Sequence, residues 1–74
     1  MTRLYRTLRW HMLDADVDTE WLARKLGMSR QSLSLRFNNK VAWRLDEMYK
    51  ILDLLNLPYT ELGNCFPKDG ISRN

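Results

Sequence analysis

Hydrophobic residues recur along this chain at the three- and four-residue spacing of α-helices, and no stretch argues for a β-strand. In residues 3–13, Leu4, Leu8 and Met12 follow one another at intervals of four, which predicts an amphipathic helix. The acidic sequence DADVD at residues 14–18 ends this helix. The pattern therefore predicts an all-α fold that begins with a short amphipathic helix.

Two further helices are predicted close together in the middle of the chain. Asp18 is placed to cap a second helix that runs to Leu26, and Gly27 follows as a left-handed C-terminal stop. Ser29 caps a third helix directly afterwards, so the two helices meet across a turn of about three residues and must cross steeply. Leu33 and Phe37 share one face of the third helix, which is expected to pack on the preceding helix.

The last third of the chain predicts one longer helix followed by short turns. Residues 45–55 have a strongly helical pattern, and Pro58 marks the next break. The segment YTELGNCF at residues 59–66 allows at most one or two helical turns, and residues 67–74 are expected to form a flexible polar tail. Residues 1–66 are thus predicted to form one domain of four to five short helices.

Size and composition exclude several classes of function. A chain of 74 residues has room for one compact core and no separate catalytic domain. The single cysteine, Cys65, excludes an intramolecular disulfide, and one histidine does not supply the ligand set of a structural zinc site. We therefore expect no metal and no cofactor. Because His11 has no nearby partner, Cys65 has no second histidine within reach and no glycine-rich phosphate loop is present, we also expect no enzymatic activity. No apolar run reaches the length of a membrane span and no signal-peptide core is present, so a cytoplasmic protein is expected.

The charges are unevenly distributed although the net charge is only +3. Residues 14–20 hold four acids and no base, whereas residues 21–45 hold six bases and no acid. Such a block is more often a solvated face than a binding site, but it also suits nucleic acid. Stacking on single strands is not favoured, because tryptophans at helical spacing more often belong to the core: Trp10, Trp21 and Trp43.

The sequence TEWLARKLGMSRQSLSLRFNNK at residues 19–40 resembles the lambda-repressor/Cro-type (XRE) helix-turn-helix family. The matching positions are a small helix residue, a turn glycine, an apolar turn residue, a capping serine and an apolar anchor, here Ala23, Gly27, Met28, Ser29 and Leu33. The following segment, WRLDEMYKILDLLNL, resembles the fourth helix of that family. Within the family, the sequence is most similar to small repressor-like proteins of phages and prophages of Gram-positive bacteria. The resemblance implies a lambda-repressor-like fold whose recognition helix, at about residues 29–38, enters the major groove of double-stranded DNA.

The predicted recognition helix has a polar face opposite its apolar anchor. On a helical wheel the residues farthest from the core are Gln31, Ser34, Leu35 and Asn38. The residues expected to contact DNA bases, by resemblance and from this wheel, are Arg30, Gln31, Ser32, Ser34 and Leu35. Two alternatives stay open. Arg30 can contact phosphate or water instead of a base, and Leu35 can either meet a thymine methyl group or pack beneath the adjoining loop.

Contacts to the DNA backbone are expected from the helix ends and the loop that follows the recognition helix. The residues expected to contact phosphate are Thr19, Arg36, Asn38, Asn39, Lys40 and Arg44. Alternatives stay open, because Arg36 can instead pair with an acid and the two asparagines can cap the C-terminus of the helix. Relatives often have a polar or basic residue and then an apolar one where this chain has Leu35 and then Arg36.

These patterns and the resemblance predict a transcriptional regulator of the repressor or Cro-like type, in the bacterial cytosol or a phage-infected cell. One helix reads few base pairs, so a homodimer on a near-palindromic operator is expected, with no small-molecule ligand and no membrane partner. The segments available for pairing, which can equally close the core, are Leu57, Tyr59, Leu62, Phe66 and the C-terminal tail. The alternative is an antitoxin-like or antirepressor-like module that uses the same scaffold to hold a protein.

Overall fold

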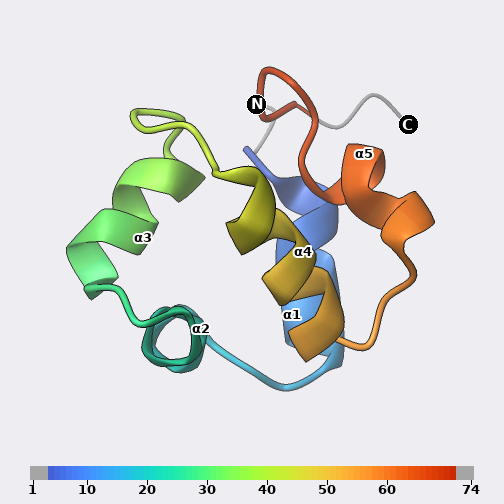
Figure 1. Ribbon diagram of the computed structural model, residues 1–74, viewed down its shortest axis with the longest axis horizontal. Coiled ribbons are helices and arrows are strands. Elements are labelled where there is room, and N and C mark those ends of the chain that lie inside the picture. The colour runs from blue at the N-terminus through green and yellow to red at the C-terminus, as the bar shows by residue number, and fades with distance from the viewer. Residues whose placement is uncertain (1–3, 72–74) are drawn as a thin grey trace.

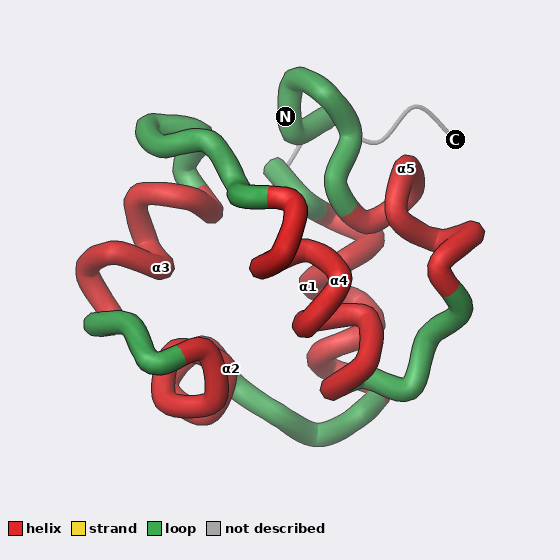
Figure 2. Tube along the Cα trace, viewed as in Figure 1, coloured by secondary structure: helices red, strands yellow, loops and turns green. Residues whose placement is uncertain are grey.

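Five short α-helices and one 3-10 turn make up the fold in the computed structural model, which describes residues 4–71 (Figures 1 and 2). The elements are α1 (Arg6–Asp14), α2 (Thr19–Leu26), α3 (Arg30–Phe37), α4 (Leu45–Leu54), η1 (Tyr59–Glu61) and α5 (Leu62–Cys65). No strand occurs within residues 4–71, as the sequence predicts. None of the helices in this range is both long enough and apolar enough to cross a membrane.

The helices enclose one core to which each of them contributes. In Figure 1, α2 and α3 lie on one side of α4 and α5 lies on the other; α3 packs against α2, and α1 packs against α5. The largest side chains with no exposed surface are Leu8, Leu22, Leu33, Ile51, Leu52 and Cys65. Burial of one large aliphatic side chain contributes about 1.5–3 kcal/mol. Because the buried residues come from all five helices, no helix keeps its apolar face covered without the others.

Aromatic rings fill the part of the core that the helices leave between α3 and α5. Trp43, in the loop before α4, packs against the core as the sequence predicts. Its ring centroid lies 5.2–6.0 Å from those of its edge-to-face neighbours, Tyr5, Phe37 and Phe66. Trp21 also packs against the core, but the expectation for Trp10 is wrong, because the Trp10 side chain on α1 is 58% exposed.

The ends of α2 and α3 are fixed by the capping residues that the sequence predicts. Asp18 Oδ1 accepts a hydrogen bond of 2.8 Å from the backbone N–H of Trp21, and Ser29 Oγ accepts one of 3.0 Å from that of Ser32. Gly27 stops α2 with a φ of 69°, a conformation in which a side chain is strained. Each cap contributes about 1 kcal/mol. The turn between the two helices is therefore specified by local chemistry.

The first helix begins later than its apolar pattern predicts. α1 begins at Arg6, because Tyr5 takes a left-handed backbone conformation with a φ of 54°. The N–H of Tyr5 donates a 2.7 Å hydrogen bond to the carbonyl of Gly70, and the Tyr5 side chain is buried. Residue 3, where the predicted helix begins, lies outside the described residues.

Residues 67–71 are not the loose tail that their polarity predicts. Gly70 is buried, and a Cβ atom added to it would lie 3.2 Å from the side chains of both Leu4 and Tyr5. The backbone carbonyl of Asp69 accepts a 3.1 Å hydrogen bond from the Asn39 side chain. This segment therefore packs against the start of the chain and belongs to the domain. The remaining residues of the predicted tail, 72–74, lie outside the described residues.

Candidate nucleic-acid interface

The recognition helix predicted from the sequence is α3, and it has one buried and one exposed face. Leu33 and Phe37 are buried, as the helical wheel predicts. The exposed residues on α3 and at its end are Arg30, Gln31, Ser34, Leu35 and Asn38. Ser32 is half-buried, and its Oγ accepts a 3.1 Å hydrogen bond from Ser29 Oγ. Four of the five predicted base-contacting residues are therefore exposed, and Ser32 is partly withdrawn.

The exposed face of α3 continues into a cleft of about 500 Å³ that residues of α1 and α2 also line. Its lining residues are Arg9, Thr19, Arg30, Gln31, Ser34, Phe37 and Asn38. Two of these side chains carry a guanidinium group and none carries a carboxylate. A concave surface with this charge attracts anions. The fold thus brings Thr19, on α2, to the same surface as the predicted base-contacting residues.

Arg9 is a residue of this surface that sequence reasoning missed. Its Nε donates a 2.9 Å hydrogen bond to the carbonyl of Leu4, and its guanidinium carbon lies 4.6 Å from the centre of the Phe37 ring. A cation this close to an aromatic face is attracted by the ring. The contact joins α1 to α3 across the cleft, so no local pattern in the sequence indicates it.

Arg36 takes the second of the two roles left open for it, because it pairs with an acid. Its Nε and second terminal nitrogen donate to the Glu47 carboxylate at 2.9 and 3.1 Å, and a third hydrogen bond of 3.0 Å reaches the Ser32 carbonyl. The two charged side chains are only 14% and 13% exposed. Burial raises the pKa of Glu47, but hydrogen bonds from Arg36 and from the Arg44 N–H outweigh it, so this pKa lies below its ordinary value. The pair fixes α3 to α4.

The two asparagines after α3 both hold structure. Asn38 is the C-cap residue, and its Nδ2 donates to the Ser34 carbonyl at 2.9 Å. Asn39 has a left-handed φ of 59°, and its Oδ1 accepts a 3.1 Å hydrogen bond from the Tyr5 hydroxyl. Because Asn39 Nδ2 also bonds to the Asp69 carbonyl, this residue ties the end of α3 to both ends of the domain. The capping alternative is therefore confirmed for Asn38, and Asn39 has a wider role.

Besides the two asparagines, three other predicted phosphate-contacting residues are exposed around this surface. Thr19 is the exposed first residue of α2, and Lys40 is exposed in the loop after α3. Arg44 Nε lies 3.3 Å from Asp46 Oδ1, but these side chains are 73% and 76% exposed. An exposed ion pair of this kind contributes about 0–1 kcal/mol, so it holds Arg44 only weakly.

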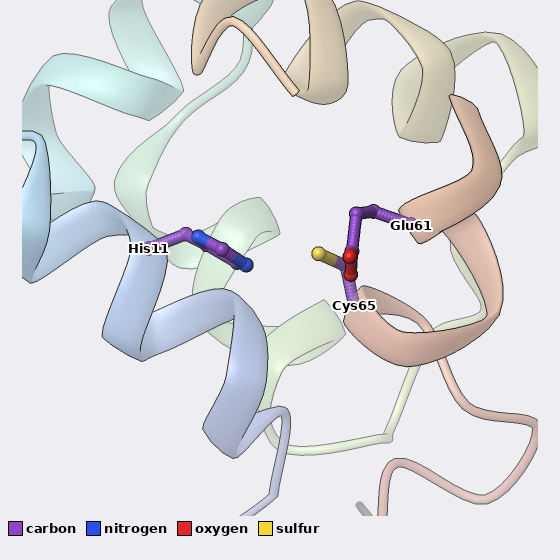
Figure 3. A group of neighbouring side chains, drawn as sticks. All are labelled: His11, Glu61 and Cys65. Atoms are coloured by element: carbon purple, nitrogen blue, oxygen red, sulfur yellow. The ribbon is translucent and has the colours of Figure 1, made fainter. Parts of the chain in front are cut away.

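A second cluster of polar side chains lies between α1 and the η1–α5 segment. Figure 3 shows the imidazole of His11 facing the thiol of Cys65 and the carboxylate of Glu61, and their ligand atoms all lie within 4.8 Å of one another. The expectation that His11 has no nearby partner is wrong, because the fold joins residues from opposite ends of the sequence. Burial, and secondly the charge of Glu61, raise the pKa of the Cys65 thiol to about 11.

Comparison with known proteins assigns the chain to a family without assigning a function. The profile of a family described as "Protein of unknown function (DUF739)" matches residues 4–69. The chain belongs to this family. No curated protein and no solved structure matches it. Any function must therefore be argued from the surface described above.

Proposed function

We propose that this member of the DUF739 family is a sequence-specific double-stranded DNA-binding regulator of the lambda-repressor/Cro-type helix-turn-helix class. The observation that carries the proposal is the exposed, acid-free face of α3, which continues into a cleft lined by two guanidinium groups. An α-helix with its side chains is about 10–12 Å across, and the major groove of B-DNA is about 12 Å wide. In this proposal α3 lies in the groove and its exposed face meets the base edges.

The proposed base-contacting residues act through the atoms that they expose. Arg30 and Gln31 are exposed in the first turn of α3, where a guanidinium can bind guanine O6 and N7 and an amide can bind adenine N6 and N7. Ser34 presents a hydroxyl one turn later, and Leu35, 39% exposed, can meet a thymine methyl group. Ser32 contributes least, because its hydroxyl already bonds to Ser29 and its backbone N–H is capped.

The proposed phosphate contacts flank this reading face. Thr19, Lys40 and Arg44 present exposed polar or cationic groups at the start of α2 and in the loop after α3. Arg9 adds a positive charge to the cleft. Arg36 is left out, because its guanidinium is bonded to Glu47. Phosphate contacts of this kind position a protein on DNA and make its affinity fall with salt.

The proposed regulator binds as a homodimer on a near-palindromic operator, because one short helix reads too few base pairs for useful selectivity. Of the pairing residues suggested by the sequence, Phe66 is buried, and Leu57 and Leu62 pack against the core. Tyr59 remains 55% exposed, with its ring 4.8 Å from that of Tyr49. These observations favour core closure for three of these four residues and leave Tyr59 as the exposed one among them.

One observation favours the second candidate function, a module that holds a protein partner. On α1, Trp10 is 58% exposed and Leu13 is 78% exposed, and both line a hollow of about 560 Å³. Exposed aromatic and large aliphatic side chains are typical of protein interfaces. This hollow is a different pocket from the α3 cleft, although Arg9 and Thr19 line both. A partner bound in the hollow would therefore share Arg9 and Thr19 with DNA bound to α3.

The experiment that tests the proposed function is selection from a random duplex library, followed by binding titrations with wild type and Gln31→Ala. A bidentate side chain discriminates between bases by about 1–3 kcal/mol, so the variant should lose roughly tenfold or more on the selected sequence and little on random DNA. Thr60→Ala, which changes an exposed residue on η1, is the control and should alter neither affinity.

Two results would count against the proposal. An equal loss by Gln31→Ala on selected and random DNA would remove Gln31 from the reading face. A library that enriches no sequence, with wild-type affinity too weak to measure at low salt, would overturn DNA binding as the function.

A further inference from the structure

The fold brings the chain's single histidine and single cysteine together. His11 lies in the last turn of α1, and Cys65 is the last residue of α5, next to Glu61 at the end of η1. The three ligand atoms lie within 4.8 Å of one another. In Figure 3 they point toward a common space between the first and last helices. This convergence follows from the packing of α1 against α5 and plays no part in the proposed DNA-binding surface.

The three donor atoms are a nitrogen, a sulfur and an oxygen, and this mixture selects among metal ions. Mg²⁺ and Ca²⁺ take oxygen ligands, and Cu⁺ is selected by sulfur ligands. Zn²⁺ binds imidazole, thiolate and carboxylate, usually in tetrahedral geometry. We propose that His11, Glu61 and Cys65 form a Zn²⁺ site with a water molecule at the fourth position. This proposal replaces the sequence-based expectation of no metal.

The distances are compatible with zinc after small side-chain rotations. Zn²⁺ binds nitrogen, oxygen and sulfur ligands at about 2.0–2.3 Å, so neighbouring ligand atoms of a tetrahedron lie about 3.5 Å apart. The separation of at most 4.8 Å therefore has to shorten by about 1 Å or a little more. All three side chains lie in the described part of the chain, and no hydrogen bond joins any two of them. Zinc binding therefore does not require a hydrogen bond between these side chains to break.

The surroundings suit a site with three protein ligands and one open position. Cys65 is fully buried, whereas His11 and Glu61 are half-buried, so one side of the cluster is open to water. Asn64 Nδ2 donates a 3.2 Å hydrogen bond to Glu61 Oε2. Carboxylates that bind metals are commonly oriented by hydrogen bonds of this kind. When Zn²⁺ binds, a Zn–S bond forms and the thiol proton leaves to solvent.

The consequence is a metal link between α1 and α5, which are far apart in the sequence. A ligand that binds only the folded state stabilises it in proportion to the logarithm of its concentration over its dissociation constant. At a free zinc concentration 100 times the dissociation constant, the expected rise in Tm for a domain of this size is on the order of 10 °C. The effect does not depend on DNA, so it stands or falls separately from the proposed function.

The test uses the full chain without an affinity tag, with the thiol kept reduced. Zinc affinity is measured by competition with a chromophoric chelator, and the expected result is one Zn²⁺ per chain together with the rise in Tm. His11→Gln and Glu61→Gln keep side-chain size and should each weaken zinc binding by more than about 100-fold, because even orienting partners contribute about 10–100-fold. Glu20→Gln, an exposed glutamate of α2, is the matched control and should bind zinc like the wild type.

Cobalt distinguishes this site from other zinc-binding sites without any substitution of the buried cysteine. Co²⁺ in place of Zn²⁺ should give the visible bands of a tetrahedral ion and a charge-transfer band from the Cys65 thiolate. The proposal is overturned if the wild type does not retain zinc against the chelator, if the cobalt protein lacks the thiolate band, or if His11→Gln binds zinc as tightly as the control.

Discussion

The Arg36–Glu47 pair gives the most quantitative prediction that the fold offers. Replacing Arg36 with methionine keeps the length of the apolar stem and removes three hydrogen bonds, two of them to the Glu47 carboxylate. Because the side chains are only 14% and 13% exposed, Glu47 is left with a largely buried charge. Breaking a buried pair costs about 3–5 kcal/mol, whereas an exposed pair contributes about 0–1 kcal/mol.

The Arg36→Met variant should therefore lose about 2–3 kcal/mol of stability, because Glu47 keeps its hydrogen bond of 2.9 Å from the Arg44 N–H. A domain of this size has a total stability of roughly 4–11 kcal/mol. The loss corresponds to a fall in Tm of roughly 10–20 °C. It is thus large enough to measure and small enough to leave a folded protein at low temperature.

The assay is urea unfolding of the wild type, Arg36→Met, Glu47→Gln and the double variant. Neighbouring charges that act together should give a coupling energy of about 0.5–3 kcal/mol in this cycle. Arg24→Met, on the exposed surface of α2, is the control and should lie within about 0.5 kcal/mol of the wild type. A loss below about 0.5 kcal/mol for Arg36→Met, or no coupling, would refute the reasoning and would return Arg36 to the residues available for phosphate.

Two further predictions follow from the charges. Lys40→Ala should weaken binding to selected and random DNA alike, and the slope of log affinity against log salt should become shallower by about one. Lys50→Ala on α4 is the control and should change neither the affinity nor the slope. A loss confined to one sequence would contradict the phosphate contact. Glu47 has a pKa below its ordinary value of 4.5, so its contribution to stability is fully present above that pH and is lost as the pH falls through the folded-state pKa. The wild type should therefore lose stability more steeply than Glu47→Gln below about pH 4.5, and parallel curves would exclude this contribution.

Local chemistry is what the sequence predicted well. The caps at Asp18 and Ser29 and the left-handed stop at Gly27 depend on groups about three residues apart in the sequence. They can therefore be predicted without tertiary information. The buried positions Leu33 and Phe37 follow from helical spacing for the same reason. Together these features place the exposed face of α3, which is the basis of the proposed function.

Contacts between distant residues are what the sequence could not supply. Arg9 gives no local sign that its guanidinium covers Phe37, and nothing in the polar segment 67–71 shows that Gly70 is buried against Tyr5. The meeting of His11 with Glu61 and Cys65 is of the same kind. Each depends on how α1 packs against elements from later in the chain, and helical periodicity carries no information on that packing.

The chain has an apolar residue and then a basic one at positions 35 and 36, the reverse of the order that is common in the family its sequence resembles. The structure gives a reason for this order. A residue on the flank of α3 next to α4 faces Glu47, whose carboxylate also accepts the N–H that begins α4. A cation is therefore favoured at position 36, because it neutralises a carboxylate that helix capping already holds in place. Leu35 then falls on the outer face, where it is 39% exposed. In this chain the basic residue thus links α3 to α4 through Glu47, and the apolar residue is left on the face that we propose meets DNA.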